Sequence, residues 1–266
     1  MGSFTAYDHD VNVYQGCSMN CAFCYSREFP VPLQEELTGR VAIGTSYDPY
    51  QPREKKEKRT RKLLQRLIRE KQVTKVGIFT RSPLILRDVD LLAQLPNVRI
   101  SMTVSPFPEA ARRKLEPNAE PNELRLAALR LLPGRRIVNV APSIPLLSDG
   151  EVPRLAVLLA WVDELCVGLT CLYPAVQAAL FPVLQELGIK RGTWEDAGRY
   201  RSWRQEYRSL WNQHWQGTGL AIWRDTHRQG WEKLSGGPLP ASFYDPWLNF
   251  ELCSEKGGKE KGHSRG

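Results

Sequence analysis

Residues 17–25 read Cys17-Ser18-Met19-Asn20-Cys21-Ala22-Phe23-Cys24-Tyr25, which places three cysteines within eight residues. The other three cysteines, Cys166, Cys171 and Cys253, lie far away in the chain. Three close thiolates can hold three irons of a 4Fe–4S cube and leave the fourth iron open. A structural zinc site would need four ligands, and no Cys-x2-Cys or His-x3-His pair elsewhere supplies the missing one. The spacing therefore favours an iron–sulfur cluster, with zinc-binding or buried structural thiols as the alternative.

The chain has the composition of a globular protein with an excess of positive charge. Of its 266 residues 42% are hydrophobic, which suffices for one core with an appendage or for two small domains. No apolar run approaches the roughly 20 residues of a membrane helix, so we expect no membrane partner. The start has no secretion signal, and thiolate ligands need a reducing interior, so we expect a cytoplasmic protein. The formal charge of +8 indicates an acidic partner, with nucleic acid as the leading candidate.

Short β-branched runs alternate with helical patterns as far as about Gly188, which predicts an α/β fold with parallel strands and crossover helices. The expected strands are 11–14, 41–45, 75–80, 98–103, 136–141 and 164–169. Helical apolar spacing lies around 63–68, 89–95, 124–131 and 155–162. Six such units are the number found in a partial (β/α)6 barrel, and in such barrels reactive groups gather on the loops after the strand C-termini.

The segment after Gly188 is rich in aromatic residues at helical spacing. An expected helix start at 193–196 is followed by aromatics three or four residues apart, on one face: Tyr200, Trp203, Tyr207, Trp211 and Trp215. Either these rings stack on bases beside the phosphate-binding Arg204 and Arg208, or they pack the helix onto the barrel, which is the commoner arrangement. We expect a barrel over 1–190 and a helical extension packed on it over 191–253. Residues 254–266 have no apolar residue to bury, and we expect them to be disordered.

Five polar segments follow the expected strands, at residues 14–25, 44–52, 80–88, 114–117 and 141–145. They read Cys-x3-Cys-x2-Cys-Tyr, Gly-Thr-x-x-Asp-Pro-Tyr-Gln-Pro, Thr-Arg-Ser with Leu-Arg-Asp, Leu-Glu-Pro, and Ala-Pro-x-Ile-Pro. In this order, over roughly residues 11 to 170, they resemble the spore photoproduct lyase branch of the radical S-adenosylmethionine (SAM) enzymes. Members of this branch are often described as predicted DNA repair photolyases. Any one segment beyond the cysteine loop would be weak support, and the ordered set is specific.

The resemblance implies a radical SAM barrel in which Cys17, Cys21 and Cys24 ligate a 4Fe–4S cluster. SAM would chelate the open iron, and an electron donor of the flavodoxin or ferredoxin type would reduce the cluster. Reductive cleavage of SAM then yields a 5′-deoxyadenosyl radical that removes a hydrogen atom from the substrate.

The resemblance also implies contacts to SAM from residues outside the ligand set. Phe23 would lie against the adenine, and Thr45 and Ser46 match a SAM-contacting strand end. Arg81 takes the place of a basic residue near the SAM carboxylate, where a guanidinium offers a bidentate contact. An ordinary surface arginine is the alternative interpretation of Arg81.

Two departures from the family pattern leave the substrate open. The lyase's hydrogen-donating cysteine has no counterpart, because the matching position reads Gly44-Thr45-Ser46. Residues 18–20 replace the usual His of the cluster loop, although these are not ligands. Cys171 follows the last expected strand and is our candidate catalytic thiol at the barrel mouth, with a buried structural thiol as the alternative for both Cys166 and Cys171.

The substrate could therefore be a nucleic acid, a peptide or a small molecule. Two other classes of protein remain: a nucleic-acid-binding protein with a structural or redox-sensing cluster, and a zinc-stabilised interaction protein. The charged segment 53–59 has both signs at i, i+4 positions, which is typical of a solvated helix face.

Overall fold

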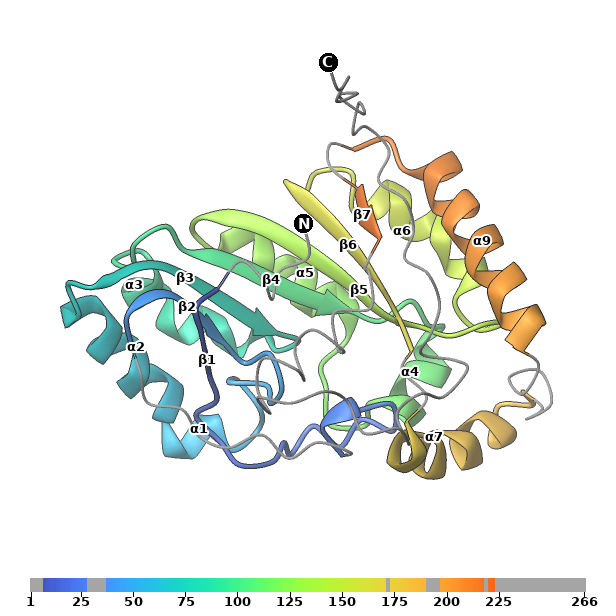
Figure 1. The fold of residues 1–266 in the computed structure, drawn as a ribbon, viewed down its shortest axis with the longest axis horizontal. Coiled ribbons are helices and arrows are strands. Elements are labelled where there is room, and N and C mark those ends of the chain that lie inside the picture. Colours follow the sequence, from blue (N-terminus) through green and yellow to red (C-terminus); the bar gives the residue numbers. More distant parts are fainter. Residues whose placement is uncertain (1–6, 28–36, 171–172, 190–196, 218–219, 223–266) are drawn as a thin grey trace, which may run out of the picture.

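The structure is a computed structural model that describes residues 7–27, 37–170, 173–189, 197–217 and 220–222, the side chains of 197–201 and 220–222 excepted. Within these residues, seven parallel strands form one sheet in sequence order. The strands are β1 (His9–Val11), β2 (Gly39–Ile43), β3 (Val73–Thr80), β4 (Arg99–Val104), β5 (Arg135–Ser143), β6 (Glu164–Leu169) and β7 (Leu220–Ile222). The α/β class and the parallel strands expected from the sequence are confirmed (Figure 1).

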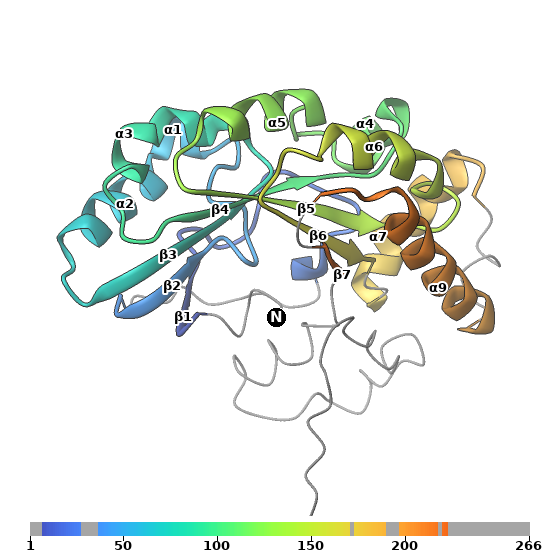
Figure 2. The same cartoon turned by 90° about the horizontal axis from the view of Figure 1, so that it is seen from above.

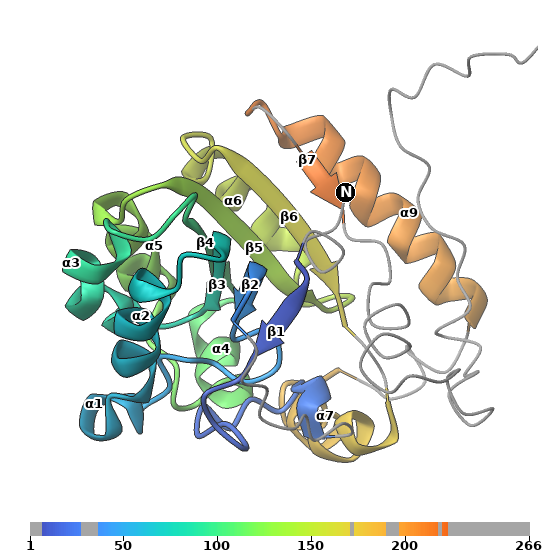
Figure 3. The same cartoon turned by 60° about the vertical axis from the view of Figure 1, so that its left-hand side comes forward.

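Helices connect the strands and cover one face of the curved sheet (Figures 2 and 3). They are α1 (Glu54–Glu57), α2 (Arg59–Arg69), α3 (Val89–Leu92), α4 (Glu109–Leu115), α5 (Asn122–Leu131), α6 (Val152–Leu158), α7 (Pro174–Glu186) and α9 (Ala197–His214). Short 3-10 turns occupy Tyr25–Arg27, Pro83–Asp88 and Asp149–Glu151. No helix in this part of the chain is both long enough and apolar enough to cross a membrane.

The two edge strands of the sheet differ from the sequence prediction. β1 ends at Val11 rather than at residue 14, because the next side chains bind the segment after β2. Asn12 accepts a hydrogen bond from the Tyr47 backbone, and the Tyr14 hydroxyl donates to Glu54. At the other end β7, which the sequence analysis did not anticipate, pairs with β6.

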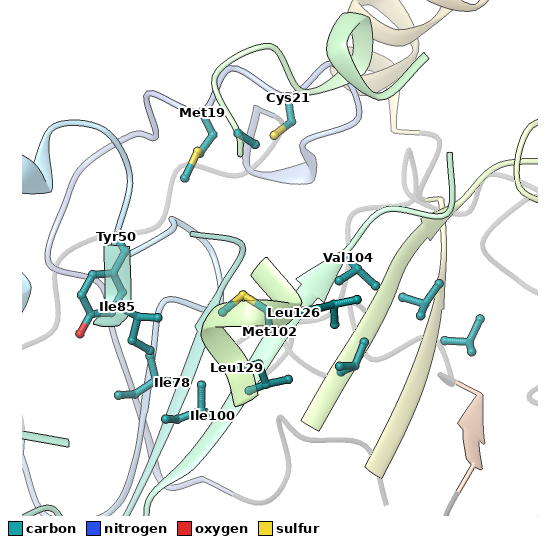
Figure 4. Packing of buried hydrophobic residues seen from close by; sticks show 14 of the residues in the cluster. Met19, Cys21, Tyr50, Ile78, Ile85, Ile100, Met102, Val104, Leu126 and Leu129 are labelled. Carbon is teal, nitrogen blue, oxygen red and sulfur yellow. The ribbon is translucent and has the colours of Figure 1, made fainter. Parts of the chain in front are cut away.

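The core lies between the sheet and its helices. Side chains of a strand alternate between the two faces, so every second residue of β3 to β6 points toward the helices. These residues are large, apolar and buried: Val76, Ile78, Ile100, Met102, Val104, Val138, Val140, Leu165 and Val167. Figure 4 shows Ile78, Ile100, Met102 and Val104 packed with Leu126 and Leu129 of α5.

The opposite face of the sheet carries smaller and more polar residues. Gly77 lies under Tyr7, whose hydroxyl would be 2.1 Å from a Cβ at that position, and the Tyr7 ring meets Phe79 edge-on. Thr103, Asn139 and Cys166 lie side by side on β4, β5 and β6. The small side chains on this face let other parts of the chain come close to the strands, as Tyr7 does at Gly77, instead of forming an apolar layer.

Three aromatic side chains of α9 lie in the protein core. Trp203, Tyr207 and Trp211 are 9%, 2% and 0% exposed, and α9 contacts α6. The Trp203 indole donates a hydrogen bond of 2.6 Å to Asp149. These rings therefore pack against protein and are not presented to bases. Residues 223–253 of the expected extension and the tail over 254–266 lie outside the described residues.

Candidate functional site

The loop that carries the three cysteines is held by segments from distant parts of the chain. It follows β1, and the backbone N–H of Ala22 donates to the carbonyl of Leu115 at 2.8 Å. The Ser18 N–H donates to Gln51 Oε1 at 2.7 Å, and Asn118 Nδ2 donates to the Ser18 carbonyl at 3.0 Å. The loops after β1, β2 and β4 thus meet, as the C-terminal ends of parallel strands must.

The three expected ligands lie on this one loop. Cys21 is buried, Cys17 and Cys24 are half-buried, and all three are free thiols. Burial raises the pKa of Cys17 to about 11, with the Asp48 charge as a further cause, and burial raises the pKa of Cys21 to about 12. The charges of Cys17 and Cys24 also raise the pKa of Cys21, so the three sulfurs lie within electrostatic reach of one another.

The donor set is made of sulfur alone. Soft thiolates are the ligands of iron–sulfur clusters, whereas carboxylates suit harder cations. Among the residues that can be described, no group of three or more His, Cys, Asp or Glu side chains has the geometry of a metal-ion site. A cube attaches its thiolates at separate iron corners, so its ligands need not converge on one point. The three thiols therefore fit a cluster by their chemistry.

Arg81 lies beneath the cysteine loop, against Phe23. Its guanidinium carbon is 5.3 Å from the centre of the Phe23 ring, and Nη1 donates to Glu116 Oε2 at 2.6 Å. Burial lowers the pKa of Arg81, but the charges of Cys21, Glu116 and Asp48 outweigh burial and raise it overall. Phe23 itself is buried and tilted against Phe107. Arg81 is thus an organised part of the site and not a free surface arginine.

Glu116 belongs to the Leu-Glu-Pro segment of the sequence, and no role as a site residue was predicted for it. Its carboxylate is fully buried and accepts from Arg81, from Ser105 Oγ at 2.9 Å and from Arg125 Nη2 at 2.5 Å. Arg112 Nη1 lies 3.5 Å from the same carboxylate. Burial raises the pKa of Glu116, but Arg125 and Arg81 outweigh it and hold the pKa below its ordinary value. The signals available in the sequence were the Leu-Glu-Pro segment itself and Arg125, a charged residue beside the apolar positions of an amphipathic helix.

Asp48 is a second residue that the sequence analysis did not single out as a site residue. Its Oδ1 accepts from Thr80 Oγ1 at 2.7 Å and from the Tyr50 N–H at 2.8 Å. Its Oδ2 accepts from the Arg81 N–H at 2.8 Å. Burial raises the pKa of Asp48 despite these donors. The carboxylate joins the loop after β2 to the end of β3.

Thr45 and Ser46 lie beside the residues that follow the third cysteine. The Tyr25 hydroxyl donates to the Thr45 carbonyl at 2.5 Å, and Ser26 Oγ donates to the Ser46 carbonyl at 2.6 Å. The Thr45 hydroxyl donates to Asp10. The structure therefore gathers the cysteines, Phe23, Arg81, Thr45 and Ser46 at one end of the sheet. Cys171 lies outside the described residues.

The described fold and site define an α/β protein with a three-cysteine loop at the C-terminal end of a parallel sheet. No family model matches the chain. It is similar to an uncharacterized protein (MJ0683) of Methanocaldococcus jannaschii, with 29% identity over 164 residues. The match covers 53% of this chain and 62% of the relative, so the chain spans less than two thirds of the relative's length. The function must therefore be argued from the site.

Proposed function

We propose that this protein is a radical SAM enzyme with a partial (β/α) barrel, in which Cys17, Cys21 and Cys24 hold a 4Fe–4S cluster. The observation that carries the proposal is the presence of three free thiols on one loop at the C-terminal end of a parallel sheet. Cys-x3-Cys-x2-Cys spacing leaves one iron of a cube without a local cysteine. When bound, the cluster and SAM supply reductive cleavage to a 5′-deoxyadenosyl radical that removes a substrate hydrogen atom.

The chain's own residues then position and shelter the reacting groups. Gln51 and Leu115 fix the backbone of the cysteine loop, because they bind Ser18 and Ala22 on either side of Cys21. Glu116 orients Arg81, which we propose binds the SAM carboxylate. A ligand-binding side chain held by a buried partner loses less freedom on binding. Phe23, Thr45 and Ser46 complete the proposed SAM contacts.

The iron content tests the proposal directly. Protein reconstituted under anaerobic conditions should bind about four irons, as a cube should. Its EPR signal after reduction should change on addition of SAM, and a reductant should then produce 5′-deoxyadenosine. A cluster without SAM cleavage would favour a nucleic-acid-binding protein with a structural or redox-sensing cluster. Stoichiometric zinc without iron uptake would overturn the proposal.

Cysteine substitutions test the ligand assignment. Cys17→Ala, Cys21→Ala or Cys24→Ala should each abolish reductive cleavage of SAM, because the cluster loses a ligand with no nearby substitute. Cys253→Ala is the matched control and should leave cleavage intact. The assignment is wrong if a loop variant keeps wild-type cleavage while the Cys253 variant loses it.

A further inference from the structure

Nearly all of the protein's net charge lies in one short segment. Residues 53–71, which include α1 and α2, contain ten basic and three acidic residues, a net charge of +7. The whole chain has a formal charge of +8, so the rest of the molecule is close to neutral. A solvated helix face accounts for the mixed charges of residues 53–59. It does not account for the cations that continue along α2.

The structure arranges the charges of α2 in a line. Arg59, Lys62, Arg66 and Arg69 recur at intervals of three and four residues, which places them on one side of the helix. All four are exposed, whereas Leu64 and Leu67 on the other side are buried in the core. The rise of an α-helix makes this row about 15 Å long. α2 contains no acidic residue.

Many of these charges are not neutralised by the protein. Arg61 turns toward Asp88 and Asp90, and surface pairs join Arg59 to Glu57 and Arg66 to Glu70. Six exposed cations have no acidic partner within the described ranges: Lys55, Lys56, Lys58, Lys62, Arg69 and Lys71. Like charges at helical neighbour positions repel one another. A bound polyanion would remove that repulsion.

The basic surface begins beside the cysteine loop. The guanidinium carbons of Arg53 and Arg59 both lie 5.3 Å from the centre of the Tyr14 ring, and Tyr14 directly precedes the loop. Gln51, just before α1, binds the loop at Ser18. Figure 1 shows α1 close to the chain that leaves β1, with α2 continuing away from it. The row of cations therefore leads to the end of the sheet where the candidate site lies.

We propose that the basic surface, defined as the exposed cations of residues 53–71, docks the phosphate backbone of a nucleic acid and leads it toward the cysteine loop. This deepens the proposed function, on which its role in substrate delivery rests. A phosphate backbone is bound by a row of cations alone. A protein partner would need apolar anchors at the centre of its interface. The exposed large apolar residues of the described chain, Val89, Leu124, Leu131, Leu146 and Val157, all lie on other elements.

The test measures the salt dependence of nucleic-acid binding by the full chain. Fluorescence anisotropy would follow a labelled single-stranded oligonucleotide and its duplex from about 50 to 200 mM salt. The test variant combines Lys55→Gln, Lys56→Gln, Lys62→Gln and Arg69→Gln. The control combines Arg113→Gln, Lys114→Gln, Arg135→Gln and Arg154→Gln, which are exposed on other elements and give the same net charge.

Each phosphate contact contributes about 0.7 to 0.9 to the slope of log affinity against log salt concentration. The four substitutions of the test variant should therefore reduce the magnitude of this slope by about three. Its affinity at about 0.1 M salt should fall roughly a hundredfold or more, while the control should stay close to wild type. Equal losses in both variants, an unchanged test variant, or absence of wild-type binding would each overturn the proposal. Equally tight binding of a polyglutamate of the same charge would also overturn it, in favour of an acidic protein partner.

The outcome is separable from that of the proposed function. SAM cleavage without nucleic acid should be unchanged in the test variant, because none of its four residues contacts the cysteine loop in the structure. If the wild type binds nucleic acid with the expected slope and does not cleave SAM, the docking surface stands and the proposed function fails.

Discussion

Glu116 illustrates how much of the site depends on one buried carboxylate. It is fully buried and faces Arg81 and Arg125, both within 2.6 Å, with Arg112 at 3.5 Å. A buried ion pair adds little net stability over an apolar substitute, but removal of one partner leaves a buried charge unpaired. The value of Glu116 is therefore that it fixes Arg81 in one place under the cysteine loop.

Loss of the Glu116 charge should destabilise the protein. Glu116→Gln keeps the shape of the side chain and should lower the free energy of unfolding by about 3–5 kcal/mol, measured by urea denaturation of the metal-free protein. Glu186→Gln removes the exposed partner of Lys114 and should cost less than about 1 kcal/mol. Similar small effects of the two substitutions would mean that the buried arginines find other partners.

Arg81 should contribute to SAM affinity without holding the cluster. Arg81→Ala should weaken SAM binding by roughly 1.5–3 kcal/mol, the scale of a hydrogen bond to a charged group, and leave the iron content unchanged. Arg81→Lys should recover part of the loss, because it keeps the charge and not the planar fork. Calorimetry on the reconstituted variants measures both effects. Wild-type affinity in Arg81→Ala would restrict this residue to packing against Phe23 and Glu116.

At the scale of elements, α9 and the cysteine loop are attached to the sheet in different ways. α9 is held by large buried rings, of which Trp211 is fully covered. The cysteine loop is joined to its neighbours by hydrogen bonds from Ser18, Ala22 and Asn118. Buried apolar surface stabilises the first attachment, whereas the second combines the buried Met19 and Phe23 with hydrogen bonds that fix the geometry of the loop.

Truncation of Trp211 should therefore be costly. Trp211→Ala should lower the free energy of unfolding by about 3–5 kcal/mol, since it leaves a large cavity between α9 and the core. Val157→Ala on α6 is the control, because that side chain is 79% exposed, and it should change stability by about 0.5 kcal/mol at most. Thermal or urea unfolding measures both. A mild effect of Trp211→Ala would show that α9 contributes little to the stability of the sheet.

At the scale of the whole molecule, the parallel sheet brings distant segments to one end. The loops after β1, β2, β3 and β4 meet there, and the basic surface of α1 and α2 begins beside them. The loop that would hold the proposed cluster is thus in contact with segments that are far from it in sequence. Any ligand that binds only the folded state stabilises it.

Cluster loading should consequently raise the thermal stability of the whole protein. The reconstituted wild type should unfold at a higher temperature than the metal-free protein, and SAM should raise the midpoint further. Anaerobic differential scanning fluorimetry measures the shifts. Cys21→Ala, treated in the same way, should show neither. A wild type whose midpoint is the same with and without iron would contradict a cluster that binds only the folded protein.

Much of the fold follows from local sequence patterns. The alternation of β-branched runs and helical spacing predicted the bounds of β6 as observed. It predicted the bounds of β1 to β5 to within a few residues. Strand–helix–strand units impose parallel pairing, so the sheet follows once its elements are known. β7 could not be predicted, because three residues carry too short a pattern and their pairing with β6 is set by tertiary packing.

The amino-acid sequence alone shows the spacing of the three cysteines, the excess of positive charge and the polar segments after the strands. These are properties of neighbouring residues, and they are visible without a fold. Three features follow only from the folded chain: Asp48 joins Thr80, Glu116 faces Arg81 and Arg125, and the row of cations on α2 faces away from the core. Each of these depends on contacts between residues far apart in the chain or on the direction in which a helix faces, and packing of the whole molecule sets both.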